Sequence, residues 1–233
     1  MKISVVIPVY NEENRIKKTA EILDGYLCFH FDDYEIIFSN DGSSDRTYEF
    51  AKKLEKEKNS IKVVGYPNNC GKGKAVKTGI FEADGDIVIF TDCDLAYGTD
   101  VIKKAVMTFE KTDADIVIGS RNLEPKSYSG YSFSRIIMSK VYFKFISFVT
   151  GLKLTDSQCG FKCFKKSAAR EIFNESKIEG FAFDLEILLN AQDRGLKIVE
   201  IPVRIINNDN DNTKVRMIKD SIDMLKDIRR IKR

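Results

Sequence analysis

Short apolar runs alternate with amphipathic stretches along the first half of the chain, and this alternation constrains the fold more than any other feature. The apolar runs are rich in β-branched residues and cover 3–9, 34–39, 61–66, 86–91 and 114–120. The stretches between them are predicted helices at 12–27, 45–58, about 73–83 and about 99–111. This order is the pattern of βαβ units. It predicts an α/β fold with a mostly parallel sheet and helices on both faces.

The composition fits one large globular domain. The chain has 233 residues, of which 43% are hydrophobic and 31% charged, and this length can bury a sizeable core. No stretch approaches 18 uncharged apolar residues, so we expect no membrane-spanning helix. The apolar run at the N-terminus passes into polar sequence without a small-residue cleavage site, which favours a first strand over a signal peptide.

Cysteine and histidine usage limits the metal chemistry. The five cysteines are odd in number and no two form a CxxC pair. Neither a disulfide framework nor a zinc knuckle is therefore expected, and a reducing cytoplasm fits best. Because His30 is the only histidine, any bound metal must be held mainly by oxygen ligands.

Polar clusters follow three of the predicted strands at the point where each strand ends. They read YNEEN after the first strand, SNDGSSD after the second and TDCD after the fourth. Ligands of open α/β sheets bind outside the carboxyl ends of the strands, so parallel strands would bring all three clusters to one crevice. Each cluster alone could be a turn with a helix N-cap, or a loop of solvated carboxylates. Their joint occurrence favours a ligand site.

Six motifs occur in an order and spacing that resemble a known family: SVVIPVYNEE, SNDGSSDRT, NCGKGKAVKTG, TDCDLAY, GSR and DSQCGFKCF. The chain resembles the inverting glycosyltransferases of family 2, which have the Rossmann-like GT-A fold. Within that family it most resembles polyprenyl-phosphate sugar synthases, the dolichyl-phosphate glucosyl type first and the mannosyl type second. The resemblance covers about residues 3–204. It implies a GT-A catalytic domain over 1–213 and a basic helical tail over 214–233.

The resemblance also implies a site for a nucleotide sugar with Mg2+ or Mn2+. Asp92 and Asp94 would hold the metal ion, which offsets the charge that grows on the leaving diphosphate. Ala96 stands where mannose synthases have a metal-binding glutamine, so water or diphosphate oxygens would replace that ligand. The stretch CGKGKAVKTG resembles a phosphate cradle, and a flexible helix cap is the alternative. Nucleotide contacts are implied for Pro8, Tyr10, Glu12, Asn40, Asp41, Lys72 and Asp92.

Basic residues in the second half of the chain favour an acceptor that carries a phosphate. A sugar hydroxyl needs a general base, whereas a polyprenyl monophosphate is already anionic and needs only cations to position it. The resemblance assigns the acceptor phosphate to Arg121, Arg135, Ser139, Lys214 and Arg216. Each arginine alone could instead form a surface salt bridge. Asp184 would organise the acceptor pocket or act as the base for a hydroxyl acceptor; favourable interaction with the dipole of a helix over 181–195 is the alternative.

Two stretches indicate contact with a membrane surface. Residues 133–152 are apolar and aromatic with interspersed basic residues, as in a helix of the membrane interface, although a core or dimer-packing helix is the alternative. Residues 214–233 can form a basic amphipathic helix. We expect a cytoplasmic protein that binds the inner membrane face peripherally, directly or through a membrane-protein partner. No nucleic-acid partner is expected, because no RNA- or DNA-binding module precedes the basic tail.

The predicted activity is inverting transfer of a hexose from UDP-glucose to a dolichyl-type polyprenyl phosphate. The motifs DSQCGFK and GFAFDLE favour the glucosyl type over the mannosyl type. The catalytic residues implied by the resemblance are Asp92, Asp94, Arg121 and Asp184. The alternatives are transfer from GDP-mannose, transfer to a saccharide hydroxyl with Asp184 as base, and a nucleotide-sugar-binding scaffold without activity.

Overall fold

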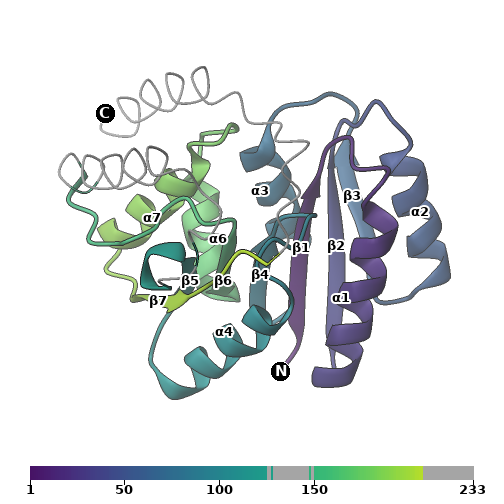
Figure 1. Ribbon diagram of the computed structural model, residues 1–233. Helices are drawn as coiled ribbons and strands as arrows, with labels where there is room; N and C mark the ends of the chain where they lie inside the picture. Colours follow the sequence, from purple (N-terminus) through teal and green to yellow (C-terminus); the bar gives the residue numbers. More distant parts are fainter. Residues whose placement is uncertain (125–126, 128–146, 148–149, 207–233) are drawn as a thin grey trace.

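The computed structural model describes residues 1–124, 127, 147 and 150–206. Figure 1 shows a central sheet with helices packed on both faces. In chain order the elements are β1 (Ile3–Val9), α1 (Ile16–His30), β2 (Tyr34–Asp41), α2 (Thr47–Glu57), β3 (Ile61–Tyr66), α3 (Lys72–Glu82), β4 (Ile87–Thr91), α4 (Asp100–Lys111), β5 (Ile116–Ser120), η1 (Arg121–Leu123), β6 (Phe161–Lys165), α6 (Lys166–Glu175), α7 (Phe183–Asp193) and β7 (Ile198–Pro202).

The predicted mostly parallel sheet is confirmed. Its seven strands lie in the order β3-β2-β1-β4-β6-β5-β7. β1 pairs in parallel with β2 and β4, β2 with β3, and β5 with β7. β6 is the exception, because it runs antiparallel to both of its neighbours, β4 and β5. The carboxyl ends of β1, β2 and β4 therefore lie along the same edge of the sheet.

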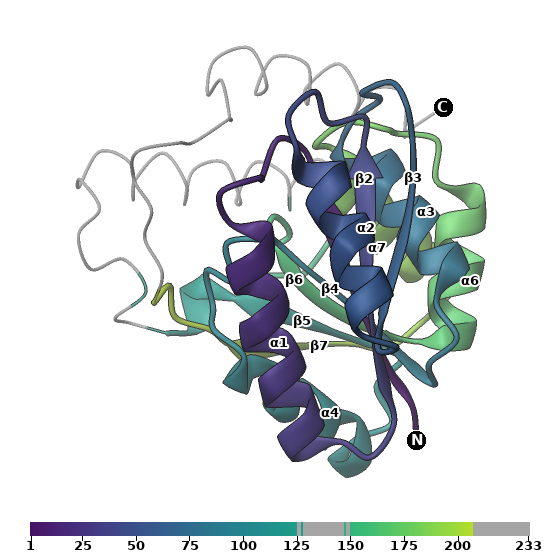
Figure 2. The same ribbon diagram turned by 90° about the vertical axis from the view of Figure 1, so that its right-hand side faces the viewer.

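Helices cover both faces of the sheet (Figure 2), and a hydrophobic core lies on each face. One core joins the sheet to α1, α2 and α4, through residues such as Leu23 and Ile102. The other joins it to α3, α6 and α7, through residues such as Ile80, Phe173 and Leu188. Successive side chains of a strand point to opposite faces, so continuous apolar strands supply both cores.

The structure differs from the predicted elements at several boundaries. α1 begins at Ile16 instead of at 12, because the residues before it form a turn in which the Glu12 carbonyl accepts hydrogen bonds from the N–H groups of Arg15 and Ile16. β2 continues to Asp41 and pairs there with Tyr66 of β3. β6, α6 and β7 were not predicted from the apolar pattern. The two lysines of β6, which reads FKCFK, interrupt its apolar run.

Two sequence predictions fall mostly or wholly outside the described residues: the interfacial helix over 133–152 and the tail over 214–233. The described helices include none that is both long and apolar enough to cross a membrane.

Candidate active site

The loops after β1 and β2 are joined by direct hydrogen bonds. The Asn11 backbone N–H donates to the Ser43 hydroxyl (3.0 Å), and the Glu12 N–H donates to the Thr47 hydroxyl (2.7 Å). On the other side, the Thr19 hydroxyl of α1 donates to the Cys93 carbonyl (2.6 Å), which ties α1 to the loop after β4. The three polar clusters that the sequence places at strand ends are thus brought to one edge of the sheet.

Asp92 and Asp94 follow β4 and flank a residue that points into the core. The Cys93 thiol is buried against α1, and burial raises its pKa to about 12. Burial also raises the pKa of Asp94, and the neighbouring Asp92 charge adds to this effect, while the Ala96 N–H donates to Asp94 Oδ1 at 3.0 Å. Cys93 therefore anchors the loop, and the carboxylates on either side of it repel each other.

The donor set at this loop fits a hard divalent cation. Two neighbouring carboxylates offer only oxygen ligands, and a cation between them would relieve their repulsion. Among the described residues no group of three or more histidine, cysteine, aspartate or glutamate side chains is placed to hold a metal ion. Ala96 supplies no side-chain ligand, and its carbonyl accepts a hydrogen bond from the Ile206 N–H (2.8 Å). Phosphate or water oxygens would have to complete the coordination.

Gly160 makes room for Asp92. A Cβ atom at this position would lie 2.1 Å from Asp92 Oδ2, far inside any allowed contact. The glycine belongs to the motif DSQCGFKCF and comes just before β6. Sequence reasoning used this motif for the family resemblance and the sugar type and missed the contact of its glycine, because the contact joins residues that are far apart in the chain.

Lys72 faces Asp92 from the first turn of α3. Its Nζ lies 2.7 Å from Asp92 Oδ1 and 5.8 Å from the centre of the Phe90 ring. Burial lowers the pKa of Lys72, whereas the carboxylates of Asp92 and Asp184 raise it. The carboxylates have the larger effect together, so the Lys72 pKa is raised overall. The Lys72 ammonium group is thus held beside the carboxylates at the predicted nucleotide site.

The glycines around Lys72 serve packing against a second segment. A Cβ atom at Gly71 would lie 2.5 Å from the Glu179 carbonyl oxygen, and one at Gly73 would lie 2.6 Å from that of Ile178. Gly71 also has a φ of +118°, which disfavours other residues. The glycines let the start of α3 lie directly against the segment that leads into α7. A flexible helix cap, the alternative interpretation of this motif, does not account for that contact.

Asp41 binds the loop that leads into α3. Its carboxylate accepts hydrogen bonds from the Tyr66 hydroxyl (2.8 Å), the Asn69 side-chain amide (2.9 Å), and the N–H groups of Cys70 (2.8 Å) and Gly71 (3.0 Å). Burial raises the Tyr66 pKa, and the Asp41 carboxylate raises it further. Asp41 therefore fixes the position from which Lys72 reaches the site. A direct contact between Asp41 and a nucleotide remains a prediction.

Other predicted nucleotide contacts lie at the same edge of the sheet. Pro8 is in β1, and Tyr10, which follows that strand, is 37% exposed. Glu12 accepts a hydrogen bond from the Arg15 guanidinium at 3.1 Å. Asn40 is buried near the end of β2, where its Oδ1 accepts from the Ser43 N–H at 3.3 Å. The structure positions these residues near one another, and their contacts with a nucleotide remain predictions.

Asp184 lies in the first turn of α7 and forms a buried ion pair. Its Oδ1 is 2.5 Å from Nζ of Lys162, which comes from β6. The side chains of Lys162 and Asp184 are 0% and 5% exposed. Burial raises the Asp184 pKa, while the ammonium groups of Lys162 and Lys72 act in the opposite direction. Sequence reasoning missed Lys162; the signal that could have revealed it is a lysine in the middle of the apolar run GFKCF.

Arg121 is bound by an aspartate of the DSQCG motif. Its Nε and Nη2 donate to the two carboxylate oxygens of Asp156, at 2.6 and 2.9 Å, and Asp156 is fully buried. Glu200 of β7 accepts from the N–H groups of Thr155 and Asp156 and so holds this loop in place. The guanidinium is therefore fixed in a bidentate pair instead of standing alone. The assignment of Arg121 to an acceptor phosphate remains a prediction, as does its catalytic role.

The other predicted acceptor residues lie outside the described part of the chain: Arg135, Ser139, Lys214 and Arg216.

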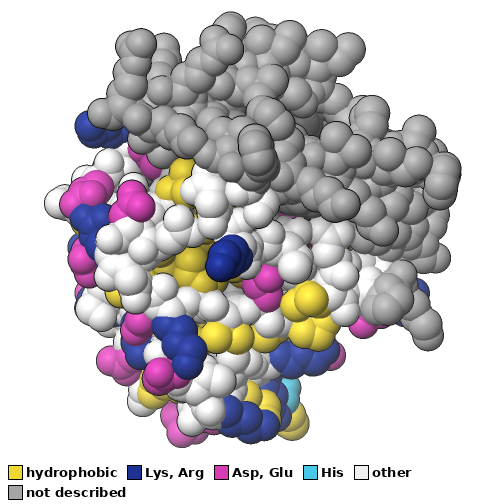
Figure 3. Space-filling view, turned by 90° about the vertical axis from the view of Figure 1, so that its left-hand side faces the viewer, with side chains coloured by type: hydrophobic (Ala, Val, Ile, Leu, Met, Phe, Trp, Pro, Cys, Tyr) yellow, Lys and Arg dark blue, Asp and Glu magenta, His cyan; other side chains and the backbone are white. Residues whose placement is uncertain are grey.

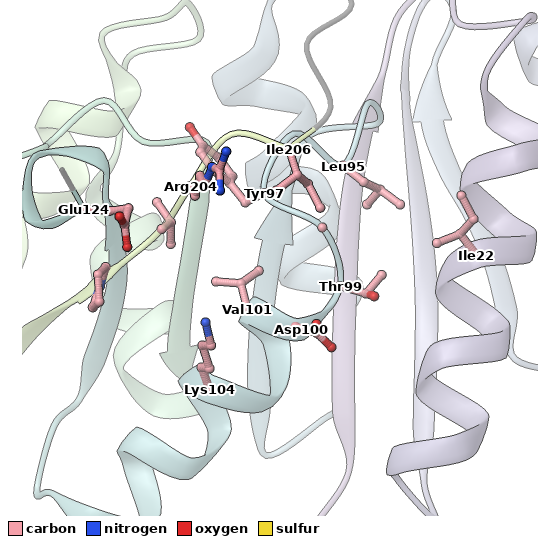
Figure 4. Close-up of a pocket in the computed structure, with 13 residues that line it drawn as sticks. Ile22, Leu95, Tyr97, Thr99, Asp100, Val101, Lys104, Glu124, Arg204 and Ile206 are labelled. Carbon is pink, nitrogen blue, oxygen red and sulfur yellow. The ribbon is translucent and has the colours of Figure 1, made fainter. Parts of the chain in front are cut away.

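A cavity of about 340 Å³ lies beside the loop that follows Asp94 (Figure 4). Its lining combines both signs of charge, with Asp100 and Lys104 from α4, Glu124 after η1, and Arg204 after β7. None of the predicted site residues that the structure describes lines it. On the side of the molecule that Figure 3 shows, basic, acidic and hydrophobic side chains are likewise interspersed.

Comparisons with known proteins identify the family of the chain. The model for glycosyl transferase family 2 matches residues 4–173. A dolichyl-phosphate beta-glucosyltransferase of Dictyostelium discoideum is 34% identical over 99% of this chain and 73% of its own length. The Saccharomyces cerevisiae protein of the same name is 32% identical over 97% of this chain and 72% of its own length.

Solved structures match the fold at lower sequence identity. A glucosyl-3-phosphoglycerate synthase from Mycobacterium tuberculosis, crystallised with Mn2+, UDP and glucosyl-3-phosphoglycerate, superposes with a TM-score of 0.67 at 19% identity. The match covers 99% of this chain and 78% of that one. The fold is thus that of the GT-A glycosyltransferases, and the chain belongs to glycosyl transferase family 2.

Proposed function

We propose that this protein transfers glucose from UDP-glucose to a dolichyl-type polyprenyl phosphate, with inversion at the anomeric carbon. The observation that carries the proposal is the similarity, along almost the whole chain, to proteins named dolichyl-phosphate beta-glucosyltransferases. The geometry supports the same chemistry, because two carboxylates and a lysine meet at the carboxyl edge of the sheet, where a nucleotide sugar is expected to bind.

On the donor side, Lys72 and the Asp92–Asp94 pair would receive the diphosphate. Lys72 already lies against Asp92 and can donate to a phosphate oxygen. Asp92 and Asp94 would hold Mg2+ or Mn2+, and when bound the cation supplies stabilisation of the charge that develops on the leaving UDP. Asp41 keeps the start of α3 in place and Gly160 leaves space for Asp92, so the groups are ordered before the donor arrives.

On the acceptor side, the reaction needs a positioned anion more than a base. A polyprenyl phosphate attacks through an oxygen that is already ionised near neutral pH, so no side chain has to remove a proton. No base is therefore assigned to Asp184, whose Oδ1 is already bound to the buried Lys162 ammonium. Arg121, Arg135, Ser139, Lys214 and Arg216 are the proposed cations and donors for the acceptor phosphate.

The place of action follows from this acceptor. Because the lipid phosphate lies in a membrane, we propose that the protein works at the cytoplasmic face and binds the bilayer peripherally, with or without a membrane-protein partner. The segments proposed to make this contact are 133–152 and 214–233.

A transfer assay tests the proposal. Purified protein receives radiolabelled UDP-glucose or GDP-mannose with Mn2+ or Mg2+ and dolichyl or undecaprenyl phosphate, and the lipid is then extracted. We expect label in the lipid from UDP-glucose and loss of transfer in Asp94→Asn. The exposed Asp193 at the end of α7 provides a matched control, because Asp193→Asn should leave transfer unchanged.

Three results would contradict the proposal, and each would identify a different function. Label in the lipid from GDP-mannose alone would identify the mannosyl type. Donor consumption that requires a saccharide would identify transfer to a hydroxyl. Binding of nucleotide sugar without turnover under any condition would identify a scaffold.

A further inference from the structure

Lys162 and Asp184 form an ion pair whose position the proposed chemistry leaves unexplained. Lys162 lies in β6, between two paired strands, and its register partner in β4 is Phe90. Its Nζ contacts Asp184 Oδ1 at 2.5 Å and the Cys159 carbonyl oxygen at 2.7 Å. The ammonium also lies 5.3 Å from the centre of the Phe90 ring. Lys162 is therefore held on three sides and cannot reach a ligand itself.

Asp184 keeps one carboxylate oxygen for another partner. Oδ1 is used by Lys162, and within the described part of the chain no donor is bound to Oδ2. Its partner Lys162 and the site residue Lys72 both place their Nζ atoms against the Phe90 ring, 5.3 and 5.8 Å from its centre, so the ion pair adjoins the end of the site that is assigned to the diphosphate. Asp184 is not part of a three-carboxylate metal cluster with Asp92 and Asp94. A metal ligand is thus not the role that the geometry gives it.

Stability does not account for this pair. Taking two charges out of water costs more free energy than most buried ion pairs return, and apolar residues of similar volume are often at least as stable. Lys162 and Asp184 lie beside Phe90 and Phe183 in the core on that face of the sheet, where such residues would fit. The presence of two charges here points to a role in binding.

We propose that Asp184 Oδ2 accepts a hydrogen bond from a hydroxyl group of the transferred hexose, and that Lys162 is the positioning residue that orients this carboxylate. The inference rests on the proposed function, in that the hexose is the one attached to the bound nucleoside diphosphate. In a nucleotide sugar the hexose is joined directly to the second phosphate, so a group near Lys72 and Asp92 is within reach of it.

The pair would then determine which hexose is accepted. An ionised carboxylate only accepts hydrogen bonds, so it selects a hydroxyl at a fixed position. A donor without that hydroxyl would leave Asp184 buried with one oxygen unsatisfied, and sites built to bind a hydroxyl reject such analogues strongly. Lys162 keeps the carboxylate in one orientation, as discrimination between neighbouring hydroxyl groups requires.

The experiment compares binding of UDP, UDP-glucose and the four analogues that lack the hydroxyl at position 2, 3, 4 or 6. Titration calorimetry with Mn2+ gives the dissociation constants, and the lipid assay gives kcat/KM. The variants are Lys162→Met, which keeps the carboxylate without its anchor, and Lys162→Met with Asp184→Leu, which removes both charges and should remain folded. Lys165→Met, a half-exposed lysine of the same strand, is the control.

We expect the wild-type protein and the Lys165→Met control to bind one deoxy analogue about 30-fold or more weakly than UDP-glucose. The ratio of the two dissociation constants, deoxy analogue over UDP-glucose, should be less than about 3 in the double variant and intermediate in Lys162→Met. Affinity for UDP itself should change little, which a purely structural defect would not reproduce.

Two results would overturn the inference: an unchanged ratio in a double variant whose melting temperature is that of the wild type, or a loss of UDP affinity equal to the loss of UDP-glucose affinity. Failure of the proposed function gives a different result, in which the wild-type protein does not label the lipid, while the binding ratios still report on Asp184.

Discussion

Replacing Gly160 by alanine tests whether the Asp92 carboxylate, a proposed metal ligand, must lie where the structure places it. The new Cβ atom would be 2.1 Å from Asp92 Oδ2, whereas non-bonded heavy atoms are comfortable at about 3.5 Å. The carboxylate must therefore retreat by more than about 1 Å. Because a displacement of this size at a reacting centre can cost about 100-fold, we expect kcat/KM to fall by about 100-fold, or about 2.7 kcal/mol of transition-state stabilisation.

The fold should tolerate this change, since the atom that must move is the end of a side chain that is 36% exposed. We expect the free energy of unfolding to change by less than about 1 kcal/mol. Lipid labelling at a series of Mn2+ concentrations measures the loss and shows whether excess metal recovers part of it. Gly25→Ala in α1 is the matched control, because its Cβ meets nothing within 4 Å and should affect only helix propensity.

Two results would refute this reasoning. If Gly160→Ala keeps wild-type activity and metal dependence, Asp92 does not need its observed position. If the variant loses activity only because it unfolds, and Gly25→Ala does not, then Gly160 serves the fold and the contact with Asp92 is incidental.

Three further predictions test other parts of the site and the fold. Lys72→Met should weaken UDP binding in calorimetry by about tenfold, because it removes a charge-assisted hydrogen-bond donor to the diphosphate. Cys93, whose pKa burial raises to about 12, should stay unmodified by a thiol reagent in the native protein while the half-buried Cys70 reacts, as mass spectrometry of the labelled peptides would show. Asp115→Asn should lower the melting temperature at neutral pH, and the difference should shrink as the pH falls below about 4. The Lys197 N–H lowers the pKa of Asp115, so its stabilisation is present above the unfolded-state pKa and is lost in acid.

The sequence predicted those helices and strands whose local hydrophobic pattern matches their burial in the fold. From β1 to β5 the strands are mainly apolar runs and the helices between them are periodic, because helices cover both faces of the sheet. The predicted helix and strand boundaries differ from the observed ones where residues make contacts with distant segments. The residues expected to start α1 instead bind the start of α2, where the N–H of Glu12 donates to the hydroxyl of Thr47.

The sequence predicted the position of a candidate site residue only where its motif directly follows a strand. The positions of Asp92 and Asp94 at the end of β4 follow from the strand pattern. The pairing of Arg121 with Asp156 does not, because it depends on how the loop before β6 returns to the end of β5. The glycines at 71 and 73 resembled a phosphate-binding loop, yet their close contacts are with the backbone before α7. Contacts between distant segments carry no signal in a local pattern.

Lys162 is the clearest conflict between local pattern and tertiary structure. A lysine in a strand is ordinarily explained by an edge position or a solvent-facing side, but β6 is flanked by β4 and β5 and the Lys162 side chain is fully buried. Sequences that fold well agree across local and global levels, and exceptions are expected where function requires them. Lys162 and Lys72 both lie against the Phe90 ring, which puts the Lys162–Asp184 pair beside the Lys72–Asp92 pair of the candidate site. We therefore attribute the buried lysine in β6 to the role proposed for Asp184 in the site.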